Sequence, residues 1–449
     1  MSERARFGSK LGGVLVAAGG AVGLGNIWRF PTEVGSNGGA AFILIYLACV
    51  LFVGLPVMLS EFIIGRHTRK NAIGAFRQLA PNRLWTLVGT QGIVVAFLIL
   101  CYYIVVSGWT AFYTVSSAAG LLTGERDFSA FFANFVASGW MPVAASLLCM
   151  AAVHVVVVRG VKEGIERASK IMMPALLLII GLLIVGSFSM SGFREGVEFL
   201  LKPDFSKVTV DVALGALGQS FYSLSLAMGG LCTYASYFSR DTNLVKTGFS
   251  VASVDTSVAV LAGFVIFPAV FTVGVNPGMG PSLVFITLPS VFNMAFTQMA
   301  WVGYVFSGMF YVLLFLAALT SAISLHEPVT AYLSEETGLS RRTAARLVSM
   351  GAGLISIACA LSLGPWKDFL IAGMTLFDLF DFVTAKIILP LGGIFIAVFA
   401  GWVMDRRIAW DELTNQGKHY TLLFRIWRFL VRWVSPTAII AVFVHELLG

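Results

Sequence analysis

The chain has 449 residues, of which 58% are hydrophobic and only 12% are charged. Soluble domains carry about 25% charged residues, so this composition excludes a set of water-soluble domains and favours one membrane-embedded bundle of helices. The net charge of +7 does not indicate a nucleic-acid partner, because lysine and arginine occur in short segments between apolar runs. The five cysteines all lie within apolar runs, which argues against a disulfide framework or a cysteine metal site.

The first apolar run follows Arg4, Arg6 and Lys10 and superficially resembles a signal peptide. It contains Asn26 and Arg29 and lacks a small-residue cleavage site, so we interpret it as a retained first helix. A membrane-spanning helix needs about 20 mostly apolar residues. The sequence therefore predicts eleven spans, at residues 10–36, 39–65, 85–119, 137–159, 168–190, 211–237, 248–274, 300–334, 342–363, 369–403 and 421–447.

Basic residues are concentrated in alternate loops of the predicted bundle. Besides the N-terminus, these loops contain Arg66, Arg69, Lys70, Arg77, Arg83, Arg159, Lys162, Arg167, Lys170, Arg341, Arg342, Arg346, Arg406 and Arg407. Because cytoplasmic loops carry the excess of lysine and arginine, we expect the N-terminus in the cytoplasm. An odd number of spans then places the C-terminus outside.

Two of the predicted spans contain segments that are poorly suited to a continuous helix. Residues 19–31, GGAVGLGNIWRFP, include four glycines and an asparagine, and residues 218–237, GQSFYSLSLAMGGLCTYASY, include serines and a glycine pair. Each glycine in a helix interior costs about 0.5–1 kcal/mol relative to alanine. Unwound backbone within a membrane is tolerated where it lines a cavity, and two such breaks are typical of a transporter binding site. Close packing of helices through small residues is the alternative explanation.

The segments GNIWRFP, SEFIIGR, YYIVVSGW, GQSFYSLSL, TYASY, FITLP, ALTSAISLHEP and FDLFDF occur in that order along the chain. In these segments the sequence resembles the neurotransmitter:sodium symporter family, in its bacterial branch of LeuT-like amino-acid transporters, over nearly its whole length. The resemblance implies an all-α membrane protein with eleven transmembrane helices, a LeuT-type five-plus-five inverted repeat and discontinuous helices 1 and 6. It divides a single transporter domain, residues 1–449, into a first repeat at 1–190, a second at 205–404 and helix 11 at 421–447.

The function implied by this resemblance is sodium-coupled import of hydrophobic or aromatic L-amino acids by alternating access. We expect a multi-pass protein of the bacterial inner membrane, with no nucleic-acid partner and a monomeric or weakly dimeric state. The absence of N-x-S/T sequons agrees with a bacterial source. Leucine, tyrosine and tryptophan are the favoured substrates.

The resemblance also implies a substrate site and two sodium sites at mid-membrane. The expected substrate-binding residues are Ala21, Gly25, Ile99, Tyr103, Phe221, Tyr222, Ser223, Ser225, Met228, Ser321 and Leu325. The first sodium would take Ala21, Asn26, Ser223 and Asp255, and the second would take Gly19, Val22, Ala317, Thr320 and Ser321. A hard cation prefers oxygen ligands, which unwound carbonyls supply, and the N-terminus of a half-helix suits a substrate carboxylate. For each apolar residue of the pocket, ordinary core packing is the alternative.

Individual residues of the site carry particular expectations from the resemblance. Tyr103 would hydrogen-bond the substrate carboxylate, and Phe221 would close over the substrate. Gly23 stands where amine-transporting members of the family carry an aspartate, so the substrate should bring its own carboxylate. Glu61 would hold backbone amides of the broken helices.

Asp255 departs from the chloride-dependent branch of the family, which has asparagine at this position. A carboxylate there would supply the negative charge that chloride provides in those members, so we predict transport without chloride. Three residues that would line the chloride site are nevertheless present, namely Tyr46, Gln219 and Ser223.

Two pairs of charged residues are expected to act as gates. Arg29 and Asp381 would form the outer pair, and Arg4 and Glu335 the inner pair. Lys386 has no role in the family pattern, and we interpret it as a lysine that is paired or that extends to the membrane surface.

Three other functions were weighed against transport. An enzyme would need a converging nucleophile and base or a metal cluster, and His326-Glu327 is not a zinc-binding HExxH motif because Thr330 occupies its last position. A channel would need a continuous polar path, which the aromatic residues interrupt. A receptor-like protein that binds substrate without moving it is left open by the sequence.

Overall fold

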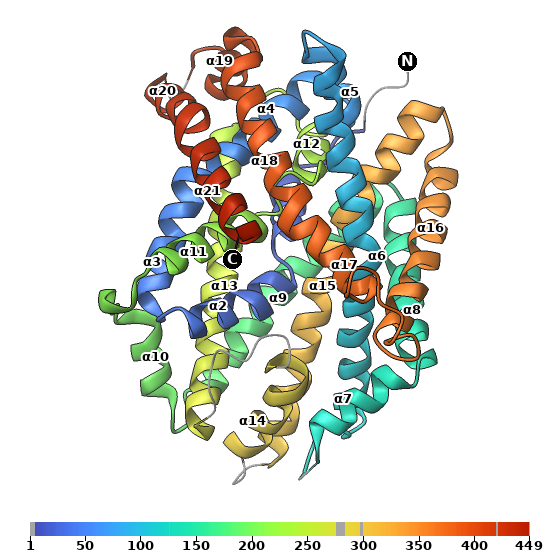
Figure 1. The fold of residues 1–449 in the computed structure, drawn as a ribbon, viewed down its shortest axis with the longest axis vertical. Helices are drawn as coiled ribbons and strands as arrows, with labels where there is room; N and C mark the ends of the chain where they lie inside the picture. Colours follow the sequence, from blue (N-terminus) through green and yellow to red (C-terminus); the bar gives the residue numbers. More distant parts are fainter. Residues whose placement is uncertain (1–4, 125, 275–282, 297–299, 419–420, 449) are drawn as a thin grey trace.

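Helices form almost the whole of the computed structural model (Figure 1). The model describes residues 5–124, 126–274, 283–296, 300–418 and 421–448. Among these residues the β-structure is limited to an isolated bridge between Ile371 and Met374. The fold is therefore a bundle of helices, as the composition predicts.

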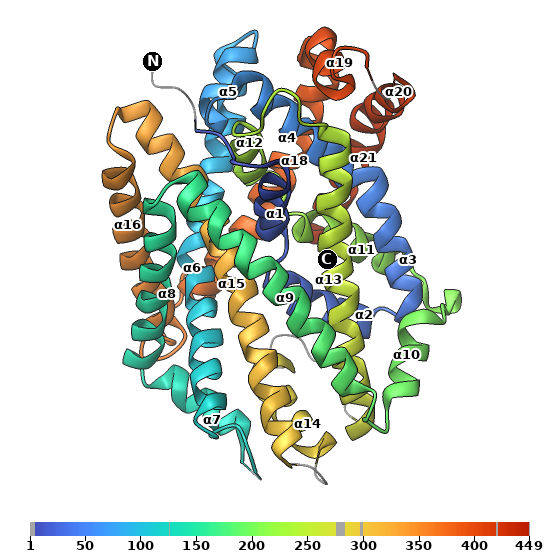
Figure 2. The ribbon, with the colours of Figure 1, turned by 180° about the vertical axis from the view of Figure 1, so that it is seen from behind.

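Long apolar helices cross the bundle from one end to the other (Figures 1 and 2). Within the described residues, nine are long and apolar enough to span a membrane without a sharp bend. They are α3–α4 (Ala40–Thr68), α6 with its first turn (Arg83–Ala118), α8 (Trp140–Val158), η4–α9 (Val161–Ser187), α13 (Leu244–Val273), α15 (Trp301–Thr337), α16 (Arg341–Ser362), α17–η9 (Leu376–Val403) and α20–α21 (Leu422–Glu446).

The first and sixth predicted spans are both broken, as their glycine content indicates. The first consists of α1 (Lys10–Ala21), a π-helical turn η1 (Gly25–Arg29) and α2 (Phe30–Ser36), with a bend of 54° at the break. The sixth consists of α11 (Val210–Ser223) and α12 (Gly230–Ala235). With these two broken helices, the described residues contain all eleven predicted spans.

The two ends of the bundle carry short helices that are not spans. The start of the described chain, α5 (Ala72–Leu79) and α19 (Arg406–Thr414) lie at one end, which we call the N end. At the opposite end lie α7 (Phe128–Ala137) and α14 (Leu288–Ala295), and α10 (Phe193–Leu201) lies toward it (Figures 1 and 2). These helices have 8 to 10 residues, fewer than a span needs, so a search for spans does not find them.

The tenth span begins later than the sequence indicates. We predict it from residue 369, but the helix begins at Leu376. The preceding residues turn back through the bridge between Ile371 and Met374, with positive φ at Ala372 and Gly373. The hydropathy of this turn resembles that of a helix end, so composition alone does not separate them.

Candidate functional site

The breaks in α1 and α11–α12 face one another across a small pocket at the centre of the bundle. The pocket has a volume of about 50 Å³, and α6 and α15 complete its walls. Ten of the eleven predicted substrate residues line it: Ala21, Gly25, Ile99, Tyr103, Tyr222, Ser223, Ser225, Met228, Ser321 and Leu325. The structure thus brings together segments that are far apart in the sequence.

The polar side of the pocket is formed by the break in α1. The backbone amide of Leu24 donates to the Tyr103 hydroxyl at 3.2 Å. A Cβ atom on Gly23 would lie 2.4 Å from Ser321 Oγ and 3.1 Å from the Tyr103 hydroxyl. The position therefore has no room for an aspartate side chain, and the polar groups around it face the pocket instead.

The eleventh predicted residue, Phe221, does not line the pocket. Phe221 lines a larger cavity of about 610 Å³ on the side opposite the N end, and its ring packs against Gly393. The neighbouring Tyr222 lines both cavities, and the Arg29 guanidinium lies 4.6 Å from the centre of its ring. Neighbouring residues of a helix point about 100° apart, so Tyr222 separates the two cavities and Phe221 does not.

A buried polar cluster joins the break of α1 to α11 and α13. Asn26 Nδ2 donates to Asp255 Oδ1 at 2.7 Å and to the Asp255 carbonyl at 3.0 Å, and it lies 3.3 Å from Ser223 Oγ. The Ser223 hydroxyl donates to Asp255 Oδ2 at 2.8 Å. Ala21 lies on the wall of the adjoining pocket. The predicted residues of the first sodium site therefore form one cluster with oxygen atoms suited to a hard cation.

The residues predicted for the second sodium also lie together. The Val22 carbonyl, at the end of α1, accepts from Ser321 Oγ at 3.1 Å and lies 3.5 Å from Thr320 Oγ1. Thr320 Oγ1 also lies 3.0 Å from the Ala317 carbonyl, and a Cβ on Gly19 would lie 3.7 Å from Thr320 Cβ. Carbonyl and hydroxyl oxygens thus converge where α15 crosses the break of α1, as a sodium site requires.

Glu61 stabilises the unwound segment between α11 and α12. Its Oε1 accepts from the Ala227 amide at 2.8 Å, and its side chain is buried. Ala227 has φ of 62° and Ser225 has φ of 51°, a conformation that costs about 1–3 kcal/mol in a residue other than glycine. The hydrogen bond to Glu61 therefore holds a backbone that would not keep this shape alone, as expected.

The predicted outer gate residues line the larger cavity without touching. Arg29 and Asp381 both face it, and Arg29 Nε lies 3.8 Å from Glu33 Oε1. No ion pair joins Arg29 to Asp381, both of which are among the described residues. Lys386, on the same wall, pairs with Glu446 of α21 at 3.1 Å, which agrees with the expected paired lysine.

The side of the pocket that faces the N end is packed closed. Phe7 lies 5.8 Å from Tyr237 and 6.3 Å from Tyr234, measured between ring centres. Of the predicted inner pair, Arg4 lies outside the described residues, while Glu335 Oε2 accepts from the Asn71 amide at 2.9 Å. The open outer cavity and the closed N end together describe an arrangement that faces one side of the membrane.

Two buried carboxylates at the N end, of which Glu327 was considered only as part of a zinc motif, have no role assigned from the sequence. Glu166 Oε2 accepts from the Gly8 amide at 2.6 Å, so it holds the start of the chain against η4. Glu327 accepts from the Tyr237 hydroxyl at 2.7 Å and forms an ion pair with Arg341. A carboxylate beside an apolar run is the signal that would have found both.

Comparison with known proteins identifies the family. The model of the sodium:neurotransmitter symporter family matches residues 4–126 and 134–449. The chain belongs to this family.

The relatives include bacterial and animal proteins. An uncharacterized sodium-dependent transporter of Bacillus subtilis, YhdH, is 37% identical over 450 residues, which cover 99% of this chain and 98% of the relative. The sodium- and chloride-dependent taurine transporter of Bos taurus is 26% identical, over 92% of this chain and 73% of the relative. The crystal structure of MhsT in complex with L-phenylalanine superposes with a TM-score of 0.89 at 40% identity, and the match covers 99% of this chain and all of MhsT.

The predictions for family and fold are confirmed by these matches. The protein is a multi-pass membrane transporter of a sodium-dependent family and not an enzyme. Its fold is that of the LeuT-like transporters, with eleven helices of which the first and sixth are discontinuous.

Proposed function

We propose that this transporter is a symporter that imports hydrophobic or aromatic L-amino acids together with sodium by alternating access. The observation that carries the proposal is the pocket between the broken helices, which combines a polar side at Gly23 and Tyr103 with an apolar side. Ile99, Met228 and Leu325 form the apolar side. The similarity to MhsT, whose structure contains L-phenylalanine, supports an apolar amino acid as the substrate.

The polar side of the pocket favours an amino acid over an amine. Gly23 has no side chain, and the crowding around it excludes a side-chain carboxylate from this part of the break in α1. A substrate amine would therefore lack an anionic partner at this position. A substrate carboxylate would instead accept hydrogen bonds from the half-helix that begins at Gly25 and from Tyr103, and it would contribute an oxygen to the first sodium.

Two sodium ions would bind at the clusters described above. Asn26, Ser223, Asp255 and the Ala21 carbonyl would hold the first, and the carbonyls of α1 and α15 with two hydroxyls would hold the second. When bound, the ions would supply positive charge that fixes the two halves of the first span to α13 and α15. This arrangement couples sodium binding to the shape of the substrate pocket.

Transport is proposed to be independent of chloride. Asn26 Nδ2 and the Ser223 hydroxyl both donate to Asp255, so the carboxylate occupies the place of an anion among these donors. The name of the taurine transporter includes chloride dependence. In this chain the fixed carboxylate would make the external anion unnecessary.

Alternating access would proceed from an arrangement that opens opposite the N end. The excess of basic residues at the N end supports a cytoplasmic location for that end, in a bacterial inner membrane. The two repeats, residues 1–190 and 205–404, would rock against one another, and approach of Arg29 to Asp381 would close the outer cavity. The protomer contains both ion sites, which supports a monomer or a weak dimer as the working unit.

An equilibrium binding measurement tests the site. We expect purified protein to bind radiolabelled phenylalanine, tryptophan or leucine in sodium buffer and to lose this binding in potassium buffer. Asn26→Leu should abolish binding in sodium, because it removes the groups that join α1 to Asp255 and Ser223. Equal binding in the two buffers would contradict the proposed coupling.

A further inference from the structure

An unneutralised basic cluster lies at the N end beside the last membrane span. Five arginines surround α19, α20 (Thr421–Phe429) and η10 (Leu430–Val434): Arg406, Arg407, Arg425, Arg428 and Arg432. Within the part of the chain that the structure describes, none of them forms an ion pair with a carboxylate. Glu412, a half-buried acid of α19, is instead bound by Arg66 and His67 of α4.

Arg428 has two other arginines of the cluster close by, and the Arg406 guanidinium lies 6.0 Å from the centre of the Phe424 ring, one turn of α20 before Arg428. Arg428 is within electrostatic range of Arg406 and Arg432. The Arg432 guanidinium lies 4.8 Å from the centre of the Trp402 ring, and its Nε donates to the Gly401 carbonyl. Gathering like charges in one place is unfavourable unless an anion binds among them, so the cluster points to an anionic ligand.

Large apolar side chains are exposed next to the cluster. Phe429 and Leu422 of α20 are 60% and 66% exposed, Trp433 of η10 is 55% exposed, and Trp402 of η9 (Phe399–Val403) is 49% exposed. Trp402 and Trp433 also contact one another edge to face at 4.9 Å. Tryptophans beside arginines at the end of a span are typical of the membrane–water boundary, so the cluster is positioned at the depth of lipid headgroups.

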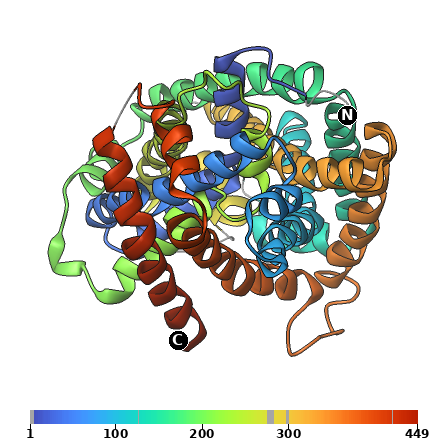
Figure 3. The ribbon, with the colours of Figure 1, turned by 90° about the horizontal axis from the view of Figure 1, so that it is seen from above.

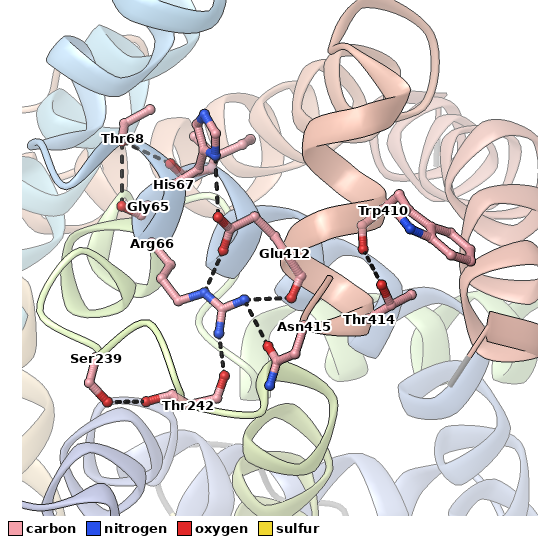
Figure 4. A network of polar contacts seen from close by, with 11 residues as sticks. Gly65, Arg66, His67, Thr68, Ser239, Thr242, Trp410, Glu412, Thr414 and Asn415 are labelled. Carbon is pink, nitrogen blue, oxygen red and sulfur yellow. Dashed lines mark hydrogen bonds and ion pairs between the residues drawn. The ribbon is translucent and has the colours of Figure 1, made fainter. Parts of the chain in front are cut away.

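The helix α19, which carries Arg406, is bonded to the transporter core (Figure 4). Arg66 bonds to the Glu412 carboxylate and backbone carbonyl, to the Thr242 carbonyl and, at 3.3 Å, to Asn415 Oδ1. His67 Nδ1 lies 3.2 Å from the other oxygen of Glu412. These contacts join α19 to α4 and to the loop before α13, so Arg406 is held in place by the transporter core.

We propose that Arg406, Arg428 and Arg432 bind the headgroup phosphate of an anionic phospholipid, whose acyl chains lie along Leu422, Phe429 and Trp433. Arginine matches phosphate because its planar guanidinium donates two parallel hydrogen bonds. Basic residues near a membrane surface attract anionic lipid. The lipid is a ligand distinct from the transported substrate, so this site goes beyond the proposed function and depends only on the N end lying at the membrane surface.

Native mass spectrometry of the purified full chain, titrated with phosphatidylglycerol or phosphatidylcholine, tests the site. We expect preferential binding of phosphatidylglycerol, and loss of this preference in the triple variant Arg406→Gln, Arg428→Gln, Arg432→Gln, with apparent affinity weakened about tenfold or more. The matched control is Arg159→Gln, Arg342→Gln, Arg346→Gln. It removes three exposed arginines from the same end, one directly after α8 and two in α16, on the other side of the bundle (Figure 3, teal-green and orange against red), and it should retain the preference.

Three results would overturn the proposal. They are equal binding of the two lipids, an equal loss in both triple variants, and displacement of phosphatidylglycerol by millimolar inorganic phosphate, which would indicate a site for a free anion. If the triple variant does not fold, the single variant Arg428→Gln answers the same question with a smaller perturbation. The titration contains neither sodium nor amino acid, so its outcome is independent of whether the transport proposal holds.

Discussion

We propose that Asp255 determines whether transport needs an external anion. Its two carboxylate oxygens accept from Asn26 and Ser223 in a buried cluster. Asp255→Asn would remove the negative charge and leave the two donors without an anionic acceptor. We expect the variant to depend on chloride. Its uptake should be at least about tenfold faster in chloride than in gluconate. Asp204→Asn, at an exposed position, should behave as the wild type, and a variant of Asp255 that ignores chloride would contradict this role.

Gly23 is limited by the space around it. A Cβ at this position would lie 2.4 Å from Ser321 Oγ, so Gly23→Ala must displace a residue that serves both the substrate pocket and the second ion cluster. We expect amino-acid binding to weaken by about tenfold or more, which corresponds to roughly 1.4 kcal/mol. Gly181→Ala, where nothing lies within 4 Å of the added atom, is the control. Unchanged binding in Gly23→Ala would show that the pocket relaxes more easily than its packing indicates.

The structure and the sequence differ on which residue covers the pocket. Tyr222 lies between the two cavities, and Phe221 lines only the outer one. Tyr222→Ala should therefore raise the dissociation constant of the substrate more than Phe221→Ala does, by at least about tenfold. Parallel binding curves of the two variants measure this difference. A larger effect at Phe221 would restore the assignment made from the sequence.

At the scale of whole elements, the sequence predicts where a helix breaks better than it predicts which face of a helix points toward the pocket. Glycine-rich stretches in α1 and before α12 predict the two breaks, because glycine weakens a helix wherever it occurs. Asn26 and Val22, two of the proposed ion ligands, lie beside the first break, whereas Asp255 of α13 and Thr320 of α15 are expected only from the resemblance to the family. The orientation of Tyr222 and the short helices α5, α7, α10, α14 and α19 depend on tertiary packing, which hydropathy does not record.

The attachment of α19 to α4 gives this element a pH-dependent stability. Burial favours the neutral acid, but the hydrogen bond from His67 and the charge of Arg66 outweigh it and hold the pKa of Glu412 below its usual range. A lowered pKa means that the ionised carboxylate stabilises the folded protein above about pH 4.5 and that this stability is lost as the pH falls through the lowered value. We expect thermal unfolding in detergent to show this loss.

The variant Glu412→Gln separates this contribution from other acids. It should lower the free energy of unfolding at pH 7 by about 1–3 kcal/mol and flatten the fall of stability below pH 4.5. The exposed acid Asp405 provides the control Asp405→Asn. Identical pH profiles for the wild type and Glu412→Gln would mean that Arg66 holds α19 through the Glu412 carbonyl and Asn415 alone.

At the scale of the whole molecule, the arrangement of cavities describes one half of a transport cycle. The cavity of about 610 Å³ opens opposite the N end, while Phe7, Glu166 and Glu327 seal the N end. The pocket between the broken helices and the two clusters proposed to bind sodium lie at the boundary between the open and sealed parts. A protein that only sensed its ligand would not need a second seal, so this arrangement favours a carrier.

Uptake into proteoliposomes tests that conclusion most directly. Radiolabelled phenylalanine, tryptophan and leucine are offered to the reconstituted protein with an inward sodium gradient, and potassium replaces sodium in the control. We predict saturable accumulation that requires the sodium gradient and that is absent in Asn26→Leu. Sodium-dependent binding in detergent without any accumulation in vesicles would contradict the account and identify the protein as a sensor.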